Sequence, residues 1–487
     1  MAKEGLSSSL FSIRELSERI KSGDISPIDL VGICLNRIKI LNPKLNAFIT
    51  VIDEQQLYNQ AQLVEKEIKQ GKYRSPLHGI PFSIKDIFYV KGVRCTAGSK
   101  ILANYVSDTD AAVVKKMSKA GAIFIGTNNL NEFASGITGI NPFYGTSKNP
   151  WDISKISGGS SGGSAVAVAT GMVQISLGTD TGGSIRVPSS LCGIVGLKPT
   201  YGRFSKHGYF PLSPSLDHVG CLTRSVWDAA VVMEYIAGGY PSDETLENSD
   251  MPAYTKIIEK SNLDGIRIGL PKEFFFNCLH PAVEQLYYDF IEALRSMGSI
   301  SVYDLDLRYT GKYYTSWRDI RLAEAAEIHL KWLNKRAYDY SDEVRNMLIQ
   351  GTKISAVNYI YALRTIREQI RKEFLSILSD KIDVIIVPTT IIPAPRLDQE
   401  TVNIGNGTIL KTREALLRNT IVFNSIGLPA ISIPIGLTKD NMPVGAQIIG
   451  PPLKEEIILS IAYNYECINN SLNKFIPPCA TMDKYKL

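Results

Sequence analysis

The sequence predicts an α/β fold, and two kinds of periodicity lead to this prediction. From Gly79 onward, short apolar segments alternate with longer segments of helical periodicity, as in α/β units. Residues 173–177 (VQISL) alternate apolar and polar side chains with a period of two, which is typical of a strand. The 487 residues are 44% hydrophobic and 21% charged, an ordinary composition for a globular protein. This length permits either two or three domains or one large α/β domain.

Helical segments are expected first, over about residues 1–75. Residues 12–15 (SIRE) form a capping box that predicts a first helix, and Gly23 ends it. Ser26 caps a second helix, with a proline at its first position and an aspartate in its first turn. A third, polar helix is expected over about residues 53–70. This helical layer carries no evident chemistry.

The remaining elements follow in chain order. Strands are expected at about residues 79–85, 122–126, 173–177, 266–270, 383–387, 430–434 and 444–449. Helices are expected at about residues 111–119, 164–171, 226–236, 281–297, 315–335 and 356–378. The segment 238–254 is rich in Pro, Ser, Asp and Glu, and we expect it to form an exposed loop between two halves of the chain.

Two glycine-rich turns, residues 158–163 and 178–183, carry the serines of greatest interest. Three interpretations compete: tight loops, a phosphate cradle and a nucleophile elbow. The sequence lacks G-x-x-x-x-G-K-[ST], and no G-x-G-x-x-G lies between a strand and a helix. The formal G-x-S-x-G match around Ser160 follows residues 151–156, which make a poor strand, whereas Ser184 follows a strand. Ser184 is therefore the better candidate nucleophile.

The residues just before Ser184 offer a place for the charge that develops during acyl transfer. The consecutive backbone amides of Thr181, Gly182 and Gly183 end on the serine. Glycine lets a ligand approach bare N–H groups closely. These amides are therefore candidates for an oxyanion hole.

A serine nucleophile needs a base, and the five histidines offer no obvious one. His329 lies in a helical pattern, where a packed or solvated role is expected, and His207 and His218 lie in a Gly/Pro/Ser loop region that leaves them open. Lys85 is the other candidate, because it closes the apolar run GIPFSI and precedes DIF. A buried lysine is costly as a cation, so burial favours its neutral, basic form.

These motifs together resemble the amidase signature family of serine hydrolases. The matching segments are GIPFSIKD around Lys85, GGSSGGS around Ser160 and GTDTGGSIR around Ser184, with 24 residues between the two serines. The resemblance also covers the N-terminal helices and the segments at about 77–237, 385–390, 423–436 and 442–450. It implies one large α/β domain with a mixed, mostly parallel central sheet covered by helices on both faces. A helical layer at about 1–75, a catalytic block at about 77–237 and a second half at about 262–487 would make up that domain.

The resemblance also implies a Ser-Ser-Lys triad. Ser184 would attack the amide carbonyl, and Ser160, which follows a cis peptide bond in the family, would relay the proton to neutral Lys85. Asp180 and Arg186 would fix the turn as an ion pair, and Ser161 would have a secondary, supporting role. Residues 128–136 would lead into the border of the acyl pocket, which makes Ser135 and Gly136 candidate substrate contacts. The two long helices at 315–335 and 356–378 would lie over the site and influence substrate choice.

Composition argues against several other classes of protein. The net charge of +5 is spread along the chain, which gives no case for direct nucleic-acid binding. Seven scattered cysteines without a C-x-x-C motif favour reduced thiols in a cytoplasmic protein and no zinc site. We expect no signal peptide, membrane span, metal or organic cofactor. A small-molecule amide substrate and a homodimer are the expected partners.

The reaction is therefore expected to be hydrolysis of a carboxylic acid amide through an acyl-enzyme. The first alternative is the glutaminase subunit of a tRNA-dependent amidotransferase, which hydrolyses glutamine for a partner and would meet nucleic acid only indirectly. Such subunits bind glutamine with an arginine, for which Arg367 is a candidate, and with an acidic residue ten positions before the G-L-P turn. Leu417 stands at that position, although Asp398 or Glu414 could substitute. The second alternative is a catalytically silent binding protein.

Overall fold

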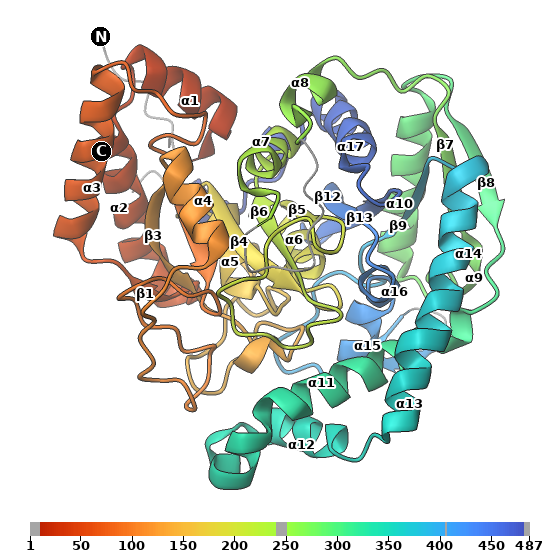
Figure 1. Cartoon of the computed structure of the whole chain (residues 1–487). Coiled ribbons are helices and arrows are strands. Elements are labelled where there is room, and N and C mark those ends of the chain that lie inside the picture. Colours follow the sequence, from red (N-terminus) through yellow and green to blue (C-terminus); the bar gives the residue numbers. More distant parts are fainter. Residues whose placement is uncertain (1–9, 240–250, 405–406, 482–487) are drawn as a thin grey trace.

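The fold is organised around a sheet of eleven strands, in a computed structural model that describes residues 10–239, 251–404 and 407–481 (Figure 1). Neighbouring strands follow the order β1, β3, β2, β4, β6, β5, β12, β13, β9, β7, β8. Their bounds are β1 Phe48–Val51, β2 Pro81–Lys85, β3 Ile123–Asn128, β4 Ile175–Asp180, β5 Val195–Lys198, β6 His218–Thr223, β7 Arg267–Pro271, β8 Ser301–Leu305, β9 Val384–Pro388, β12 Ala430–Leu437 and β13 Pro443–Ile449. A small ribbon pairs β10 (Thr401–Asn403) with β11 (Ile409–Lys411). Strands from both halves of the chain thus share one sheet.

The sheet is mixed, as expected, but the expectation that it is mostly parallel is wrong. Parallel pairing joins β2 to β3 and β4, and β7 to β8 and β9. The other six neighbouring pairs of the eleven described strands are antiparallel. The connections explain this difference, because β12 and β13 are joined by a short turn at residues 438–442 and need no crossover helix.

Two strands at the centre of the sheet, β5 and β6, were not expected. His218 begins β6, which pairs with both β4 and β5, whereas the sequence placed this histidine in a loop region. The preceding Gly/Pro/Ser-rich segment is indeed irregular, and the strand begins only after it.

The helices follow most of the expected segments. The first, α1 (Ile13–Ser22), begins with the predicted capping box and ends at Gly23. The next are α2 Pro27–Leu45, α3 Glu54–Lys69, α4 Ala112–Ala120, α5 Gly162–Ala169, α6 Arg186–Cys192, α7 Val226–Ile236, α8 Tyr254–Glu259, α9 Lys272–Phe275 and α10 Pro281–Arg295. The last are α11 Tyr313–Arg336, α12 Asp342–Gly351, α13 Ala356–Ile360, α14 Arg367–Asp380, α15 Thr412–Leu417, α16 Ile421–Ser425, α17 Glu455–Asn469 and α18 Ser471–Lys474. A π-helical segment at 361–366 joins α13 to α14, where one continuous helix was expected.

Helices cover both faces of the sheet, and the alternation along β9 demonstrates it. Val384 and Ile386 pack into the core formed with α7, α10 and α17. Ile385 and Val387 point to the opposite face and pack against α14 and α16. All four side chains are fully buried, so the central strands are apolar on both sides, as in a three-layer α/β protein.

The helical N-terminal layer, α1 to α3, lies beside the end of the sheet that carries β1 and β3 (Figure 1). Residues 240–250 of the expected exposed loop lie outside the described residues. Within the part that the structure describes, no helix is both long and apolar enough to cross a membrane.

Candidate active site

Lys85 and Ser160 are in direct contact at the carboxyl ends of two parallel strands. Lys85 is the last residue of β2, and Thr179 lies near the end of the neighbouring strand β4. The Lys85 Nζ donates to Ser160 Oγ at 2.7 Å and to Thr179 Oγ1 at 2.8 Å. Ser160 follows a cis peptide bond from Gly159, as the resemblance implied. This edge of a parallel pair is a common place for ligand sites in α/β sheets.

The surroundings of Lys85 favour its neutral form. Its side chain is fully buried, and this burial lowers the pKa of Lys85 to about 7, against the opposing effect of the carboxylates of Asp217 and Asp180. An amine with a pKa near 7 can take up and release a proton at neutral pH, which a general base must do.

Ser184 lies in the turn that follows β4, beside the loop that carries Ser160. The Ser161 N–H donates to the Ser184 carbonyl at 3.2 Å, and the Ser161 Oγ donates to the Thr179 carbonyl at 3.3 Å. Among the described residues no hydrogen bond joins the hydroxyls of Ser160 and Ser184 directly. Catalytic hydrogen bonds often tighten only when substrate is bound. The backbone contacts made by Ser161 therefore bring the two serines to one place.

Every carbonyl of the turn from Asp180 to Ser184 accepts a hydrogen bond. Besides the Ser161 N–H, the donors are Asn424 Nδ2 to Asp180 (2.7 Å), Trp317 Nε1 to Thr181 (2.9 Å), Thr420 Oγ1 to Gly182 (2.5 Å) and the Val187 N–H to Gly183 (2.7 Å). The C=O and N–H of one trans peptide unit point in opposite directions. These bonds therefore also fix the directions of the N–H groups that follow, including those of Thr181 and Gly182.

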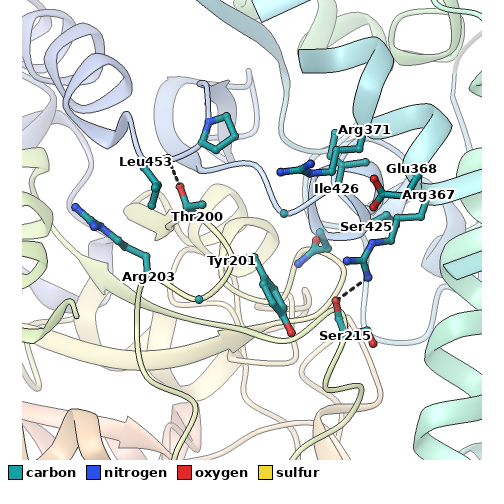
Figure 2. Close-up of a pocket in the computed structure, with 14 residues that line it drawn as sticks. Thr200, Tyr201, Arg203, Ser215, Arg367, Glu368, Arg371, Ser425, Ile426 and Leu453 are labelled. Carbon is teal, nitrogen blue, oxygen red and sulfur yellow. Dashed lines mark hydrogen bonds between the residues drawn. The ribbon is translucent and has the colours of Figure 1, made fainter. Parts of the chain in front are cut away.

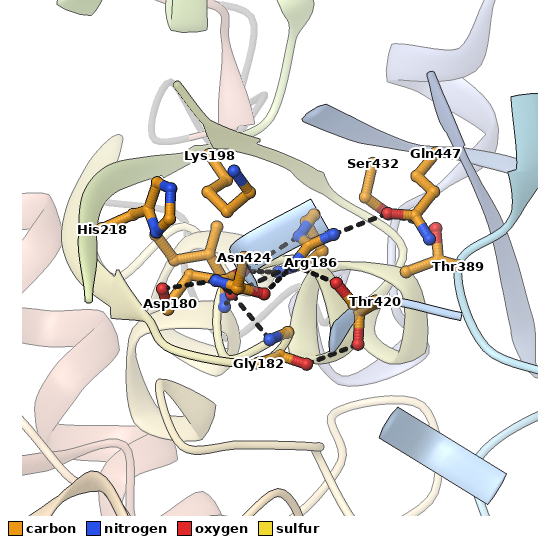
Figure 3. Close-up of polar contacts among 12 residues, drawn as sticks. Asp180, Gly182, Arg186, Lys198, His218, Thr389, Thr420, Asn424, Ser432 and Gln447 are labelled. Atoms are coloured by element: carbon orange, nitrogen blue, oxygen red, sulfur yellow. Dashed lines mark hydrogen bonds and ion pairs between the residues drawn. The ribbon is translucent and has the colours of Figure 1, made fainter. Parts of the chain in front are cut away.

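The predicted ion pair between Asp180 and Arg186 is present and fully buried (Figure 3). Arg186 Nε donates to Asp180 Oδ2 and Nη2 donates to Oδ1, each at 3.1 Å. Nη1 donates to Gln447 Oε1, and Nη2 also donates to Asn424 Oδ1 and the Thr420 carbonyl. Burial alone would raise the pKa of Asp180, but the charge and hydrogen bonds of Arg186 outweigh it and lower that pKa well below its usual range.

One of the three expected oxyanion donors is already engaged. The Gly183 N–H donates to Asp180 Oδ1 at 2.6 Å, so it supports the turn, and its assignment as an oxyanion donor needs correction. Glycine is required here because Gly183 has a φ of +134°, and a Cβ would meet Thr420 Oγ1 at 2.4 Å. At Gly182, a Cβ would come within 2.6 Å of the Trp317 ring. Thr181 and Gly182 remain as the candidate donors.

A narrow cavity lies next to Ser184. Its lining includes Ser135 and Gly136, in agreement with their expected place, together with Ala134, Ile137, Thr181, Gly182, Leu212, Trp317, Arg321, Arg413 and Leu417. The space open to water measures about 10 Å³, roughly that of a single water molecule. A substrate therefore needs some of these side chains to move apart.

Arg367, the expected glutamine-binding arginine, does not line this cavity. It lies in a separate pocket of about 270 Å³ with Tyr201, Arg203 and Arg371, where its Nη1 donates to the Ser215 carbonyl at 3.5 Å (Figure 2). The arginines beside Ser184 are instead Arg321 and Arg413. The alternative acidic residues, Asp398 and Glu414, are likewise absent from the described lining of the cavity.

Sequence reasoning missed most of the residues that hold the turn. Trp317, Thr420 and Asn424 are 136, 238 and 244 residues from their partners in the turn, so no local motif identifies them. Asp217 also holds it, by accepting from Thr181 Oγ1 at 2.6 Å.

The histidines do not take part in the cavity. His218 donates from Nδ1 to the Leu216 carbonyl, and His329 packs among aromatic rings as expected for a packed histidine. Neither is among the described residues that line the cavity beside Ser184.

Comparison with known proteins shows the family of the chain. Residues 29–459 match the Amidase family. The chain belongs to the amidase family. It is 36% identical to the A subunit of the glutamyl-tRNA(Gln) amidotransferase of Carboxydothermus hydrogenoformans, over 93% of this chain and 96% of that protein. The corresponding protein of Coxiella burnetii is also 36% identical, over 93% and 96% of the two chains.

Solved structures show the same relationship. One, described as a vestigial protein complex that reveals the evolutionary origins of an s-triazine catabolic enzyme, has a TM-score of 0.89 and 32% identity over 94% of this chain and 98% of the other. A second, a crystal structure of an amidase, has a TM-score of 0.85 and 34% identity over 94% and 100% of the two chains. This member of the amidase family is thus an enzyme that hydrolyses the carbon–nitrogen bond of amides.

Removing the guanidinium beside Asp180 tests how far the turn depends on it. We expect Arg186→Met to lower the free energy of unfolding by about 3–5 kcal/mol, because it leaves a carboxylate buried without its cation. The measurement is urea denaturation. The control is Arg396→Met, which removes an exposed ion pair with Asp398 and should cost less than about 1 kcal/mol. Equal costs for the two variants would contradict this account of the turn.

Proposed function

We propose that the protein hydrolyses a carboxylic acid amide through an acyl-enzyme on Ser184, with Lys85 as the general base and Ser160 between them. The observation that supports this proposal most is the contact between the buried Lys85 Nζ and Ser160 Oγ at 2.7 Å, at a site where the pKa of Lys85 is about 7. A buried amine with this pKa has the proton affinity that general-base chemistry requires.

In the first half of the reaction, the Ser184 Oγ forms a bond to the carbonyl carbon of the amide. The proton of its hydroxyl passes to Ser160 while Ser160 gives its own proton to Lys85 Nζ. The N–H groups of Thr181 and Gly182 stabilise the resulting oxyanion, and their directions are held by the bonds from Asn424 and Trp317.

In the second half, the carbon–nitrogen bond breaks, and the leaving nitrogen takes the proton back from Lys85 through Ser160. Water then attacks the Ser184 ester, giving its proton to the same relay, and the acid leaves as Ser184 regains its hydrogen. The relay thus acts first as base and then as acid, and it ends as it began.

A second candidate function is that of the glutaminase subunit of a tRNA-dependent amidotransferase, which would act with partner subunits. The names of the curated relatives favour it. The described residues that line the cavity argue against free glutamine, because Leu417 and two arginines stand there and no carboxylate faces an α-ammonium. We therefore favour hydrolysis of an amide by this chain itself.

The experiment that tests the proposal is ammonia release by the purified chain alone. The panel contains aliphatic amides, aromatic amides, indole-3-acetamide, glutamine and asparagine. We expect turnover of simple amides, and a loss of about 10⁴-fold or more in kcat for Ser184→Ala. The matched control is Ser190→Ala, because the Ser190 hydroxyl is buried and lies outside the described lining of the cavity.

Two outcomes would count against this proposal. Activity on glutamine only, or activity that starts only when partner subunits are added, would support the second candidate function. Activity that survives Ser184→Ala unchanged would remove Ser184 from the reaction.

The pH dependence tests the role of Lys85 separately. For a neutral amide, we expect kcat/KM to rise with pH through about 7 and to level off above it, because only the neutral amine accepts a proton. The measurement is kcat/KM between pH 5.5 and 9 with a substrate that has no titratable group. A rate that is constant across this range, or that falls as pH rises through 7, would contradict Lys85 as the base.

A further inference from the structure

The cavity beside Ser184 contains a buried guanidinium that forms no ion pair with a carboxylate of the described residues. Arg321 lies on α11, one turn after Trp317, and is 5% exposed. Its Nη1 donates to the thioether sulfur of Met347 at 2.9 Å, and its Nε has no hydrogen-bond partner within the described chain. A thioether is only a weak acceptor. A buried charge without a paired carboxylate is costly, so this arginine is poised to bind an anion.

A second arginine lines the same cavity. Arg413 on α15 donates from Nη1 to the Ser135 carbonyl and to Glu343 Oε1, each at 3.2 Å. The Glu343 side chain is 70% exposed, so it compensates the charge mainly at the outer rim. Burial and then the charge of Arg413 lower the pKa of Arg321 to about 9, against the smaller opposing effects of Tyr314 and Glu343, which indicates that the two guanidinium groups repel one another.

These arginines are close to the reacting groups. Trp317 lies against Gly182, donates to the Thr181 carbonyl, and has the Arg321 guanidinium carbon 5.0 Å from its ring centre. Arg413 is linked to the cavity wall through Ser135, whose Oγ contacts the Met347 sulfur at 2.8 Å. An anion that replaced Met347 at Arg321 would thus lie in the same cavity as Ser184.

We propose that this cavity recognises a half-amide of a short dicarboxylic acid, with its carboxylate on Arg321 and Arg413 and its amide carbonyl at Ser184. This inference rests on the proposed function of Ser184. Guanidinium groups suit carboxylates because they form charge-assisted, often bidentate hydrogen bonds. Leu212 and Leu417 provide apolar contacts for the methylene carbons. The reaction takes half-amide and water to the dicarboxylate and ammonium.

The same lining selects against an amide that also carries an ammonium group. No aspartate or glutamate is among the described residues of the cavity, and a substrate cation would face two arginines there. Glutaramate, which is glutamine without its α-amino group, is therefore the better substrate of the two.

The first test compares substrates on the unmodified chain. Malonamate, succinamate and glutaramate are each compared with the neutral diamide of the same length, and glutaramate also with glutamine. We expect kcat/KM for the best half-amide to exceed that for its diamide by about 10- to 100-fold, which is the effect that a hydrogen bond to a charged group typically has. A diamide hydrolysed as well as its half-amide, with Ser184→Ala still abolishing activity, overturns this inference and leaves the proposed function intact.

The second test removes the arginines. Arg321→Gln and Arg413→Gln are each expected to reduce the ratio of kcat/KM for the half-amide to kcat/KM for the diamide by about tenfold or more, through a higher KM for the half-amide. Arg318→Gln is the matched control, because Arg318 lies on the same helix, is exposed and pairs with Asp319. Because Arg321 is buried, the partly exposed Arg413 keeps the test valid if Arg321→Gln fails to fold. A preference unchanged in both folded variants overturns the inference.

If the chain hydrolyses no amide, a binding measurement still tests the anion site independently of the proposed reaction at Ser184. Such a result would reject the proposed function, and isothermal titration of succinamate and succinamide into the full chain would then decide the anion site. Tighter binding of succinamate by tenfold or more, lost in Arg413→Gln, supports the site. Equal binding of the two compounds overturns it.

Discussion

The active site depends on the buried ion pair between Asp180 and Arg186. Its carboxylate accepts from the backbone N–H groups of Gly183 and Ile185, and its guanidinium extends to Asn424 and Gln447. Removing either partner of such a pair leaves a buried charge without compensation and destabilises the fold. When every donor and acceptor of the pair is hydrogen-bonded, the network instead holds its surroundings rigidly. The pair therefore joins the turn before Ser184 to two other segments of the chain, and the direction of the backbone in that turn follows from it.

Burial has opposite consequences for the two charged groups nearest to the reaction. Among the described residues, the Lys85 Nζ donates only to hydroxyl groups, so desolvation dominates and its pKa falls to about 7. Asp180 has a guanidinium in bidentate contact, so it remains charged despite equal burial. The same low-polarity interior thus supplies a neutral base in one place and a fixed charge in another. Arg321 is a third case: it is a buried cation, and no carboxylate of the described residues is in contact with it.

Features that depend on neighbouring residues could be predicted from the sequence. Features that depend on contacts between distant segments could not. Short apolar segments and capping patterns placed most strands and the first helices, the apolar run before Lys85 made it a candidate base, and the glycine-rich turns made Ser160 and Ser184 candidates. Strand order depends on which segments meet after folding, so the excess of antiparallel pairs and the central strand β6 were not foreseen. Nor could the sequence show that Arg367 lines a pocket other than the cavity beside Ser184. Arg367 and Arg321 both lie on long helices of the second half of the chain, and only their packing shows which one lines the cavity.

The most direct test of the central claim is to find which serine becomes covalently modified. The purified chain would be treated with a short-chain alkyl fluorophosphonate, which reacts with activated serine hydroxyls, and the modified peptide identified by mass spectrometry. The account predicts that the label lies on Ser184, that it abolishes amide hydrolysis, and that Lys85→Met slows the labelling, because the base has been removed. A label on Ser160 or on another serine, with the same loss of activity, would contradict the account.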